Sequence, residues 1–266
     1  MSAPDAASDG GAAALVSVEG GVGVVTMDYP ARRNALSLPL RERLHDGLRT
    51  LLDDESCRVI VLTGAGGCFS AGGDISSMQG VTPVAGRTRL RRIHRVIRLL
   101  MESEKPVVAA VEGWAVGAGV SLAAACDIVV AASDARFACS FGKIGLVPDL
   151  GAAYSLVTRM GLGRARYMMM TGATFSADQA ERMGLVEVQC EPGRALETAR
   201  TMAAGMADSA PLSLAMTKTL TARMPDTLDA MLKAEVEAQA VLFATEDFAE
   251  GRTAFLEKRK PAFKGR

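Results

Sequence analysis

Two glycine-rich turns, each directly after an apolar run typical of a buried β-strand, constrain the fold of this chain most. Residues 69–74 (FSAGGD) follow the run 59–63, and residues 113–119 (GWAVGAG) follow the run 107–111. Glycine lets the backbone approach a ligand closely and turn its N–H groups outward. Two such turns from different strands would direct two N–H donors at one oxygen. That arrangement is an oxyanion hole, which stabilises negative charge on a carbonyl.

Strand and helix patterns alternate up to about residue 190, and helical patterns follow, punctuated by Pro211, Pro225 and Pro261. We expect strands within 15–27 (a hairpin around Gly20 and Gly21) and at 59–63, 107–111, 128–132 and 186–189. We expect helices at 39–53, 88–102, 119–125, 150–160 and 163–170, and one capped by Ser176 that ends at Gly184. The pattern predicts an α/β fold with a helical C-terminal part. We divide the chain into a flexible N-terminus (1–13), a core (14–195) and a C-terminal helical region (196–266).

Composition narrows the class of protein and its compartment. The formal net charge of zero argues against a nucleic-acid partner or an acidic membrane surface. The five cysteines are odd in number and form no Cys-x-x-Cys, so we expect neither a disulfide framework nor a zinc or other metal site. The first residues lack the basic start and apolar stretch of a signal peptide. Charges and glycines interrupt the most apolar stretch, 107–132, which argues against a membrane span. These observations predict a cytoplasmic protein.

The second turn has a second reading that the residues alone leave open. It precedes an apolar helix whose free N–H groups and positive dipole end would favour an anionic oxygen. Close packing of a helix on a sheet also requires small residues, however. The turn does not complete a dinucleotide fingerprint, because Ser121 and Leu122 stand where the third glycine would fall. No Gly-Lys-Ser/Thr follows either turn, which excludes a nucleotide P-loop.

Taken together, the motifs of this chain resemble those of the crotonase superfamily, which includes enoyl-CoA hydratases and isomerases. The motifs that carry the resemblance are RNAL at 33–36, FSAGGD at 69–74, the segment 113–128, GLVPD at 145–149, Gly172 and FLEKRKP at 255–261. The resemblance implies a ClpP/crotonase spiral of ββα units, followed by helices that build trimers or dimers of trimers. It also implies an acyl-CoA thioester as substrate, whose coenzyme A makes any further cofactor unnecessary.

The resemblance also implies roles for individual residues. The backbone N–H groups of Gly73 and Ala118 would form the oxyanion hole. The adenine end of CoA would lie near Arg33, Ala35, Ala71, Asp74 and Ile75. Lys258 or Lys260, from a neighbouring subunit, would meet the CoA phosphates. As a bare sequence feature, that basic tail is also compatible with a solvated helix end.

This chain departs from the hydratase pattern of the family at two positions. Hydratases use two glutamates, one to activate water and one to deliver a proton. Those positions hold Ser121 and Phe141 here, and neither side chain can act as a general base. We expect both to line the acyl pocket instead, with Ser121 able to hydrogen-bond a ligand. The stretch 76–86 is expected to shape the same pocket.

One acid, Asp149, stands where family members that move a double bond carry a single acid. The segment 141–149 is similar in particular to the 1,2-epoxyphenylacetyl-CoA isomerase branch. The resemblance implies that Asp149 removes a proton beside the conjugated system, while the oxyanion hole holds the dienolate, and returns the proton elsewhere. The other reading makes Asp149 the N-cap of a helix starting at Leu150, which would lower the pKa of its carboxyl.

The sequence therefore favours an enoyl-CoA double-bond isomerase acting on substrates from fatty acid or aromatic breakdown. The first alternative is an enoyl-CoA hydratase of fatty acid β-oxidation with atypical catalytic residues. A non-catalytic acyl-CoA binding protein is the second. A serine hydrolase built on Ser121 is the third, but it would need His45 or His94 as base. We expect His94 to be a packed core residue, because it lies between Ile93 and Ile97.

Overall fold

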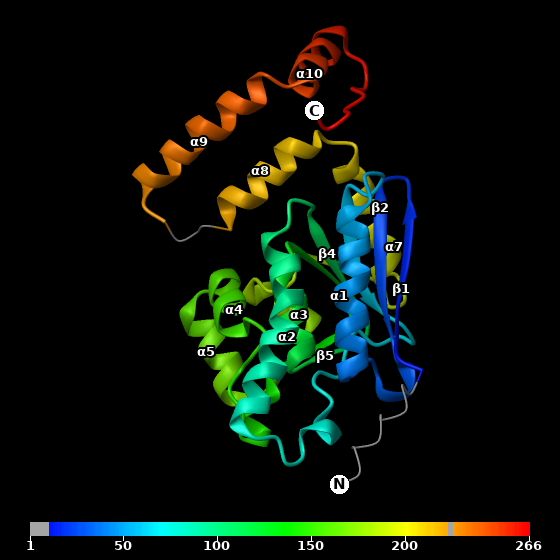
Figure 1. Cartoon of the computed structure of the whole chain (residues 1–266), viewed down its shortest axis with the longest axis vertical. Helices are drawn as coiled ribbons and strands as arrows, with labels where there is room; N and C mark the ends of the chain where they lie inside the picture. The colour runs from blue at the N-terminus through cyan, green and yellow to red at the C-terminus, as the bar shows by residue number, and fades with distance from the viewer. Residues whose placement is uncertain (1–10, 223–225) are drawn as a thin grey trace.

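A six-stranded sheet in the order β1-β2-β3-β4-β6-β9 forms the centre of the molecule (Figure 1). The computed structural model describes residues 11–222 and 226–266. The strands are β1 (Ala13–Glu19), β2 (Val22–Asp28), β3 (Val59–Gly64), β4 (Val107–Val111), β6 (Ile128–Ala132) and β9 (Val188–Cys190). The first two form the predicted antiparallel hairpin, with Gly20 and Gly21 at positive φ. All later pairings in this sheet are parallel, so the carboxyl ends of β3 and β4 lie at one edge. The predicted turns leave from that edge.

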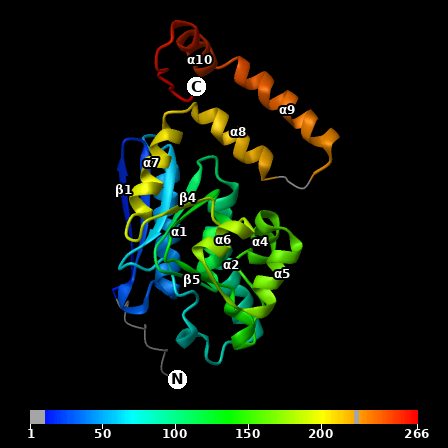
Figure 2. The same cartoon turned by 180° about the vertical axis from the view of Figure 1, so that it is seen from behind.

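Both faces of the sheet are buried at β2, β3, β4 and β6, which explains the continuous apolar runs in these strands. Helix α1 (Leu38–Asp53) packs on the hairpin and on α2 (Pro83–Glu102) on one face. Helix α7 (Ala195–Ala207) covers the other face, as the two opposite views show (Figures 1 and 2). Alternate residues of one strand enter different cores: Ile60 faces α1, and Val59 and Val61 face α7. The side of α7 against the sheet carries Ala195, Ala199, Ala203 and Ala207.

A second, three-stranded sheet in the order β5-β7-β8 was not predicted. Its strands are β5 (Trp114–Val116), β7 (Arg136–Ala138) and β8 (Thr174–Ser176). Three residues are too few to show a period of two, so tertiary pairing rather than local pattern creates them. Strand β5 lies within the second glycine-rich turn, and its register with β7 holds that turn in place.

The remaining helices that precede α7 are short. They are the 3₁₀ helices η1 (Pro30–Arg32), η2 (Ile75–Met78) and η3 (Ser140–Ile144), and the α-helices α3 (Ala118–Ala125), α4 (Ala152–Met160), α5 (Leu162–Thr171) and α6 (Ala177–Met183). Ser176 caps α6 with Gln179 in a capping box, as predicted for its N-terminus. Helix α2 is longer than predicted, because Thr82 caps it and Pro83 opens it.

Three helices, α8 (Pro211–Thr221), α9 (Leu228–Phe243) and α10 (Glu246–Glu257), extend from one end of the molecule (Figure 1). None of the residues of α9 is buried, although Leu232, Val236 and Phe243 are apolar and mostly exposed. The predicted boundary at 195/196 falls at the start of α7, a helix that packs on the sheet. The extended part therefore begins after α7. The predicted N-terminal segment 1–13 lies outside the described residues as far as residue 10, and Ala13 begins β1.

In residues 11–222 and 226–266, no helix is both long and apolar enough to cross a membrane.

Candidate active site

Asn34 holds the loops beneath the first turn together. The backbone of Asn34 lies in the left-handed region, with a φ of +55°. The buried Asn34 side chain accepts a hydrogen bond from Tyr29 N (2.8 Å) and donates to Ala65 O (2.9 Å) and Cys68 O (2.6 Å). Three loop segments are thereby fixed by one amide, whose four hydrogen-bonding sites are well suited to the task. This contact explains structurally why an asparagine stands in the RNAL motif.

Ser70 then joins the first turn to the second. Its backbone N–H donates to Trp114 O (2.9 Å), and its carbonyl accepts from Val116 N (3.0 Å), as in a parallel bridge. Its hydroxyl donates to Asn34 O (2.8 Å) and accepts from Gly72 N (3.1 Å). Backbone pairing therefore fixes the spacing of the two turns, as the sequence predicted from their positions after neighbouring strands.

Glycines are required where the turns touch. A Cβ on Gly72, whose φ is +97°, would lie 2.4 Å from Val116 O and 3.4 Å from Ala118 N. A Cβ on Gly119 would lie 2.5 Å from Ser70 O. Real Cβ atoms do not approach backbone oxygen so closely, so any side chain here would push the turns apart. These two glycines therefore serve the close packing of backbone on backbone, the alternative to ligand binding that the residues alone left open.

The two predicted donors are available for a ligand. In the part of the chain that the structure describes, no hydrogen bond is donated by the N–H of Gly73 or Ala118 to another residue. Ala118 is the first residue of α3, whose N-terminus carries a partial positive charge. Both residues line a cavity of about 180 Å³. An oxygen bound there would meet backbone donors and a helix dipole of the sign that stabilises an oxyanion.

The same cavity brings together half of the residues predicted for the site. They are Ala71, Gly73, Ile75, Ala118, Phe141 and Asp149. Phe141 is 6% exposed and supplies an apolar wall. Of the described residues that line this cavity, Asp149 is the one acid.

Asp149 lies in the loop between η3 and α4, held by an unusual backbone. Leu150, which follows it, has a φ of +53°, and Gly151 has a φ of +75°. Gly151, not Asp149, is the N-cap of α4. The capping interpretation of Asp149 is therefore wrong, and the helix predicted from Leu150 begins at Ala152.

The Asp149 carboxyl is suited to proton transfer. Its Oδ1 is buried and has no hydrogen-bond partner. Burial raises the pKa of Asp149 above its usual value, and the positive charges of Arg41, His94 and Arg89 oppose that rise. A carboxylate with a raised pKa and a free oxygen is a better base than a solvated one. His94 itself is exposed, so its predicted core position is wrong.

Predicted CoA contacts cluster beside the first turn. Arg33 is exposed, and its carbonyl accepts from Ala71 N (2.8 Å). The half-buried Ala35 precedes Leu36, whose N–H donates to Gly72 O. Asp74 caps η2, with Ser76 donating to its carboxylate. These residues, Arg33, Ala35 and Asp74, thus lie next to the cavity without lining it.

Ser121 and the two tail lysines lie outside the cavity. Ser121 is fully buried in α3, and its hydroxyl donates to Gly117 O (3.2 Å). Lys258 follows α10, and Lys260 pairs with Asp208 (2.7 Å). Helix α10 lies at the end of the molecule opposite to the first turn of α2, which borders the site (Figure 1). Within one subunit the tail lysines are therefore remote from the two turns.

Two arginines that border the site were not predicted. Arg41 on α1 and Arg89 on α2 line a second cavity of about 410 Å³, which shares Arg41, Met78, Leu146 and Asp149 with the first. Arg41 is only 6% exposed. The sequence did contain a signal for the burial of Arg41. This residue falls three and seven residues before the buried Leu44 and Leu48, on the apolar stripe of its helix.

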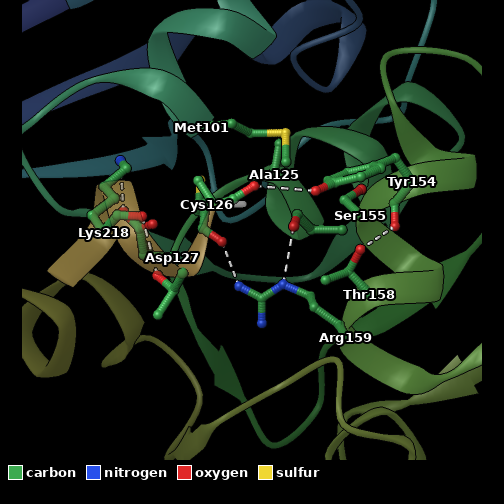
Figure 3. Close-up of a pocket in the computed structure, with 12 residues that line it drawn as sticks. Met101, Ala125, Cys126, Asp127, Tyr154, Ser155, Thr158, Arg159 and Lys218 are labelled. Atoms are coloured by element: carbon green, nitrogen blue, oxygen red, sulfur yellow. Dashed lines mark hydrogen bonds and ion pairs between the residues drawn. The ribbon is translucent and has the colours of Figure 1, made fainter. Parts of the chain in front are cut away.

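A third cavity, of about 220 Å³, is drawn in Figure 3 and shares no lining residue with the two cavities at the predicted site. The charged side chains that line this cavity already form hydrogen bonds and ion pairs with other residues of the chain. Arg159 donates to the carbonyls of Ala124 (2.9 Å) and Cys126 at the end of α3. Lys218 pairs with Asp127 (2.8 Å) and donates to Leu100 O (2.7 Å). These contacts stabilise the C-terminus of α3 and attach α8 to the core. The charged side chains of this cavity therefore have a structural role. No cluster of three or more metal-binding side chains occurs in residues 11–222 and 226–266.

Solved structures with this arrangement define the class of protein. The chain matches the crystal structure of enoyl-CoA hydratase from Bacillus anthracis with a TM-score of 0.91 and 30% identity, over 95% of this chain and 99% of that one. An enoyl-CoA hydratase structure from Polaromonas gives a TM-score of 0.90 and 34% identity, over 94% and 99% of the two chains. The fold is therefore the crotonase fold.

The sequence comparisons give the family. The family described as enoyl-CoA hydratase/isomerase matches residues 17–266. The short-chain-enoyl-CoA hydratase of Clostridium acetobutylicum is 36% identical over 255 residues, 95% of this chain and 98% of its own. The 1,2-epoxyphenylacetyl-CoA isomerase of Escherichia coli is 34% identical over 257 residues, with the same coverage. This chain belongs to the enoyl-CoA hydratase/isomerase family, and it is an enzyme of that family acting on acyl-CoA thioesters.

Proposed function

We propose that this protein is an enoyl-CoA double-bond isomerase with Asp149 as its single acid–base group. The observation that carries the proposal is the free, buried Oδ1 of Asp149 in the cavity that also holds the Gly73 and Ala118 donors. A reaction that removes and returns one proton needs one such carboxylate. Hydration by two acids would need a second, and Ser121 and Phe141 occupy the positions where the family pattern puts them.

The proposed reaction begins with the thioester oxygen accepting hydrogen bonds from Gly73 and Ala118. Asp149 removes a proton from the carbon beside the double bond, and the negative charge moves to the thioester oxygen as a dienolate. The two N–H groups and the α3 dipole stabilise that charge. The protonated Asp149 then returns its proton at another carbon, which shifts the double bond and restores the carboxylate. Atoms balance without any group beyond the CoA of the substrate.

The test compares 3-enoyl-CoA with 2-enoyl-CoA, followed by the ultraviolet absorbance of the conjugated thioester. Wild type should convert 3-enoyl-CoA to the conjugated isomer. Asp149→Asn should lose that activity and still bind acyl-CoA, because the oxyanion donors are backbone groups. Asp178→Asn, a matched change on the surface of α6, should retain full activity. Unchanged turnover by Asp149→Asn would refute the assignment.

A hydratase with atypical residues is the second candidate, supported by the names of relatives such as the C. acetobutylicum enzyme. The same assay separates it, because hydration of 2-enoyl-CoA removes the absorbance. Tight binding of acyl-CoA with neither reaction would favour a non-catalytic binding protein.

For the CoA moiety, we propose contacts near Arg33, Ala35, Ala71, Asp74 and Ile75. The exposed apolar residues of α9 support a homotrimer or dimer of trimers. In such an assembly Lys258 and Lys260 of a neighbouring subunit would reach the CoA phosphates. Analytical ultracentrifugation tests the assembly, and a monomer at micromolar concentration would refute it. Five free cysteines fit a reducing, cytoplasmic location.

A further inference from the structure

Arg41 is a buried cation that lines two adjoining cavities. Its Nε donates to Leu36 O at 2.8 Å. For its other two nitrogens, no hydrogen bond to a residue in the described part of the chain is found, and the residue as a whole is 6% exposed. Burial lowers the pKa of Arg41 to about 10, so the guanidinium remains charged at neutral pH.

Asp149 does not serve as its partner. The two charges attract each other across the cavities, but the hydrogen bond of Arg41 goes to Leu36 O, and Asp149 Oδ1 has no partner. A buried guanidinium with two free nitrogens is costly unless a bound anion completes its hydrogen bonds. Its planar fork matches a carboxylate, which it binds through two parallel hydrogen bonds.

The larger cavity, of about 410 Å³, continues from the oxyanion cavity past Arg41. Its walls are mainly apolar, with Val81, Leu90 and Val147 among them. The second cation, Arg89, also lines it, but two of its nitrogens are bound to Ser77 (2.7 and 3.1 Å). Among the described residues that line this cavity, two cations face one acid, Asp149.

We propose that the larger cavity holds the far end of the acyl group and that Arg41 selects acyl chains ending in a carboxylate. This inference rests on the proposed placement of the thioester at Gly73 and Ala118. Arg41 Nη2 lies 3.9 Å from the position that a Cβ of Gly73 would take. The carboxylate therefore binds close to the thioester, which favours short dicarboxylic acyl groups. Arg89 supports the same charge from the outer wall.

The test uses saturated esters, which cannot isomerise or hydrate, so that binding is measured apart from the reaction. Adipyl-CoA and hexanoyl-CoA have the same chain length and differ in the terminal carboxylate. By isothermal titration calorimetry, adipyl-CoA should bind at least about tenfold more tightly, the effect of a charged hydrogen bond. Arg41→Met should abolish or invert that ratio. Arg95→Met, which removes an exposed arginine of α2 paired with Glu42, should leave it unchanged.

The outcomes separate this inference from the proposed function. Equal binding of the two esters to wild type overturns the carboxylate selection and leaves the isomerase proposal standing. Equal weakening of both esters by Arg41→Met also overturns it, because Arg41 would then bind the thioester oxygen. If neither ester binds, the proposed acyl-CoA site itself fails. Should Arg41→Met not fold, Arg41→Lys keeps the charge without the planar fork, and it should reduce the ratio while retaining binding of hexanoyl-CoA.

Discussion

Replacing Gly72 with alanine should separate the two turns that form the oxyanion hole. The new Cβ would lie 2.4 Å from Val116 O, whereas ordinary contacts begin at 3.4 Å, so the turns must move by about 1 Å. A displacement of about 1 Å at a reacting centre costs about 100-fold in rate. Loss of one oxyanion donor alone costs about 10²- to 10³-fold. We therefore expect kcat of Gly72→Ala to fall at least about 100-fold on any enoyl-CoA that the enzyme converts.

Controls must separate this displacement from backbone strain, because Gly72 also has a φ of +97°. A left-handed backbone costs a non-glycine residue about 1–2 kcal/mol. Gly20→Ala has a similar penalty, at φ +57° with open space around it, and should lower the melting temperature without affecting kcat. Gly119→Ala has no such penalty and would meet Ser70 O at 2.5 Å, so it should lose activity by contact alone.

The assay is steady-state turnover with the melting temperature of each variant measured in parallel. If Gly72→Ala and Gly119→Ala remain folded and turn over within about threefold of wild type, the backbone contact does not set the donor geometry.

Three further predictions follow from the charges and thiols of the core. Because the pKa of Asp149 is raised, kcat/KM should rise with pH through a midpoint above the usual carboxyl value. The melting temperature of Asp149→Asn should exceed that of wild type at pH 8, since stability from a raised carboxyl pKa is lost as pH rises through that pKa. The difference in melting temperature should close in acid, and a difference that persists there would count against the raised pKa of Asp149. Lys218→Met should lower the free energy of unfolding by about 2–4 kcal/mol in urea titrations, because it removes the partner of Asp127 and of the Leu100 carbonyl. A decrease in this free energy below measurement error would show that the contact is dispensable. A thiol reagent should label Cys190 before the four buried cysteines, and peptide mass spectrometry would detect this order. Burial protects the sulfurs of the four buried cysteines, and it raises the pKa of Cys126 to about 12. Simultaneous labelling of all five cysteines would indicate global unfolding instead.

The α/β core was predictable from local pattern. Leu40, Leu44, Leu48 and Leu51 mark one face of α1, and all four are buried. The parallel strands β3, β4 and β6 also matched, because each is an apolar run bounded by turn residues. The three-residue strands of the second sheet could not be predicted, since their pairing is set by distant segments.

The site was predictable where motifs specify backbone, and less so where a single side chain must be placed. Gly73 and Ala118 meet at one cavity as expected from two strand ends. Asp149 was open to a capping interpretation because Asp is a common N-cap, and only the φ values of Leu150 and Gly151 show that the helix begins later. His94 follows Ile93 by one residue, a rotation of about 100° around the helix, which takes it out of the core.

The contact of Gly72 and Gly119 with opposing backbone has an evolutionary consequence. Every atom that would hold the thioester oxygen belongs to the main chain, and the two turns that carry those atoms are held together by backbone pairing and by the buried side chains of Ser70 and Asn34. Substitutions at positions 141 and 149, which line the cavity, can therefore change the chemistry without moving the backbone donors. A mutant library restricted to those two positions should contain many folded proteins that still bind acyl-CoA and differ in the bond they make or break. The backbone that would hold the oxyanion can thus be inherited unchanged, while the side chains around the cavity vary.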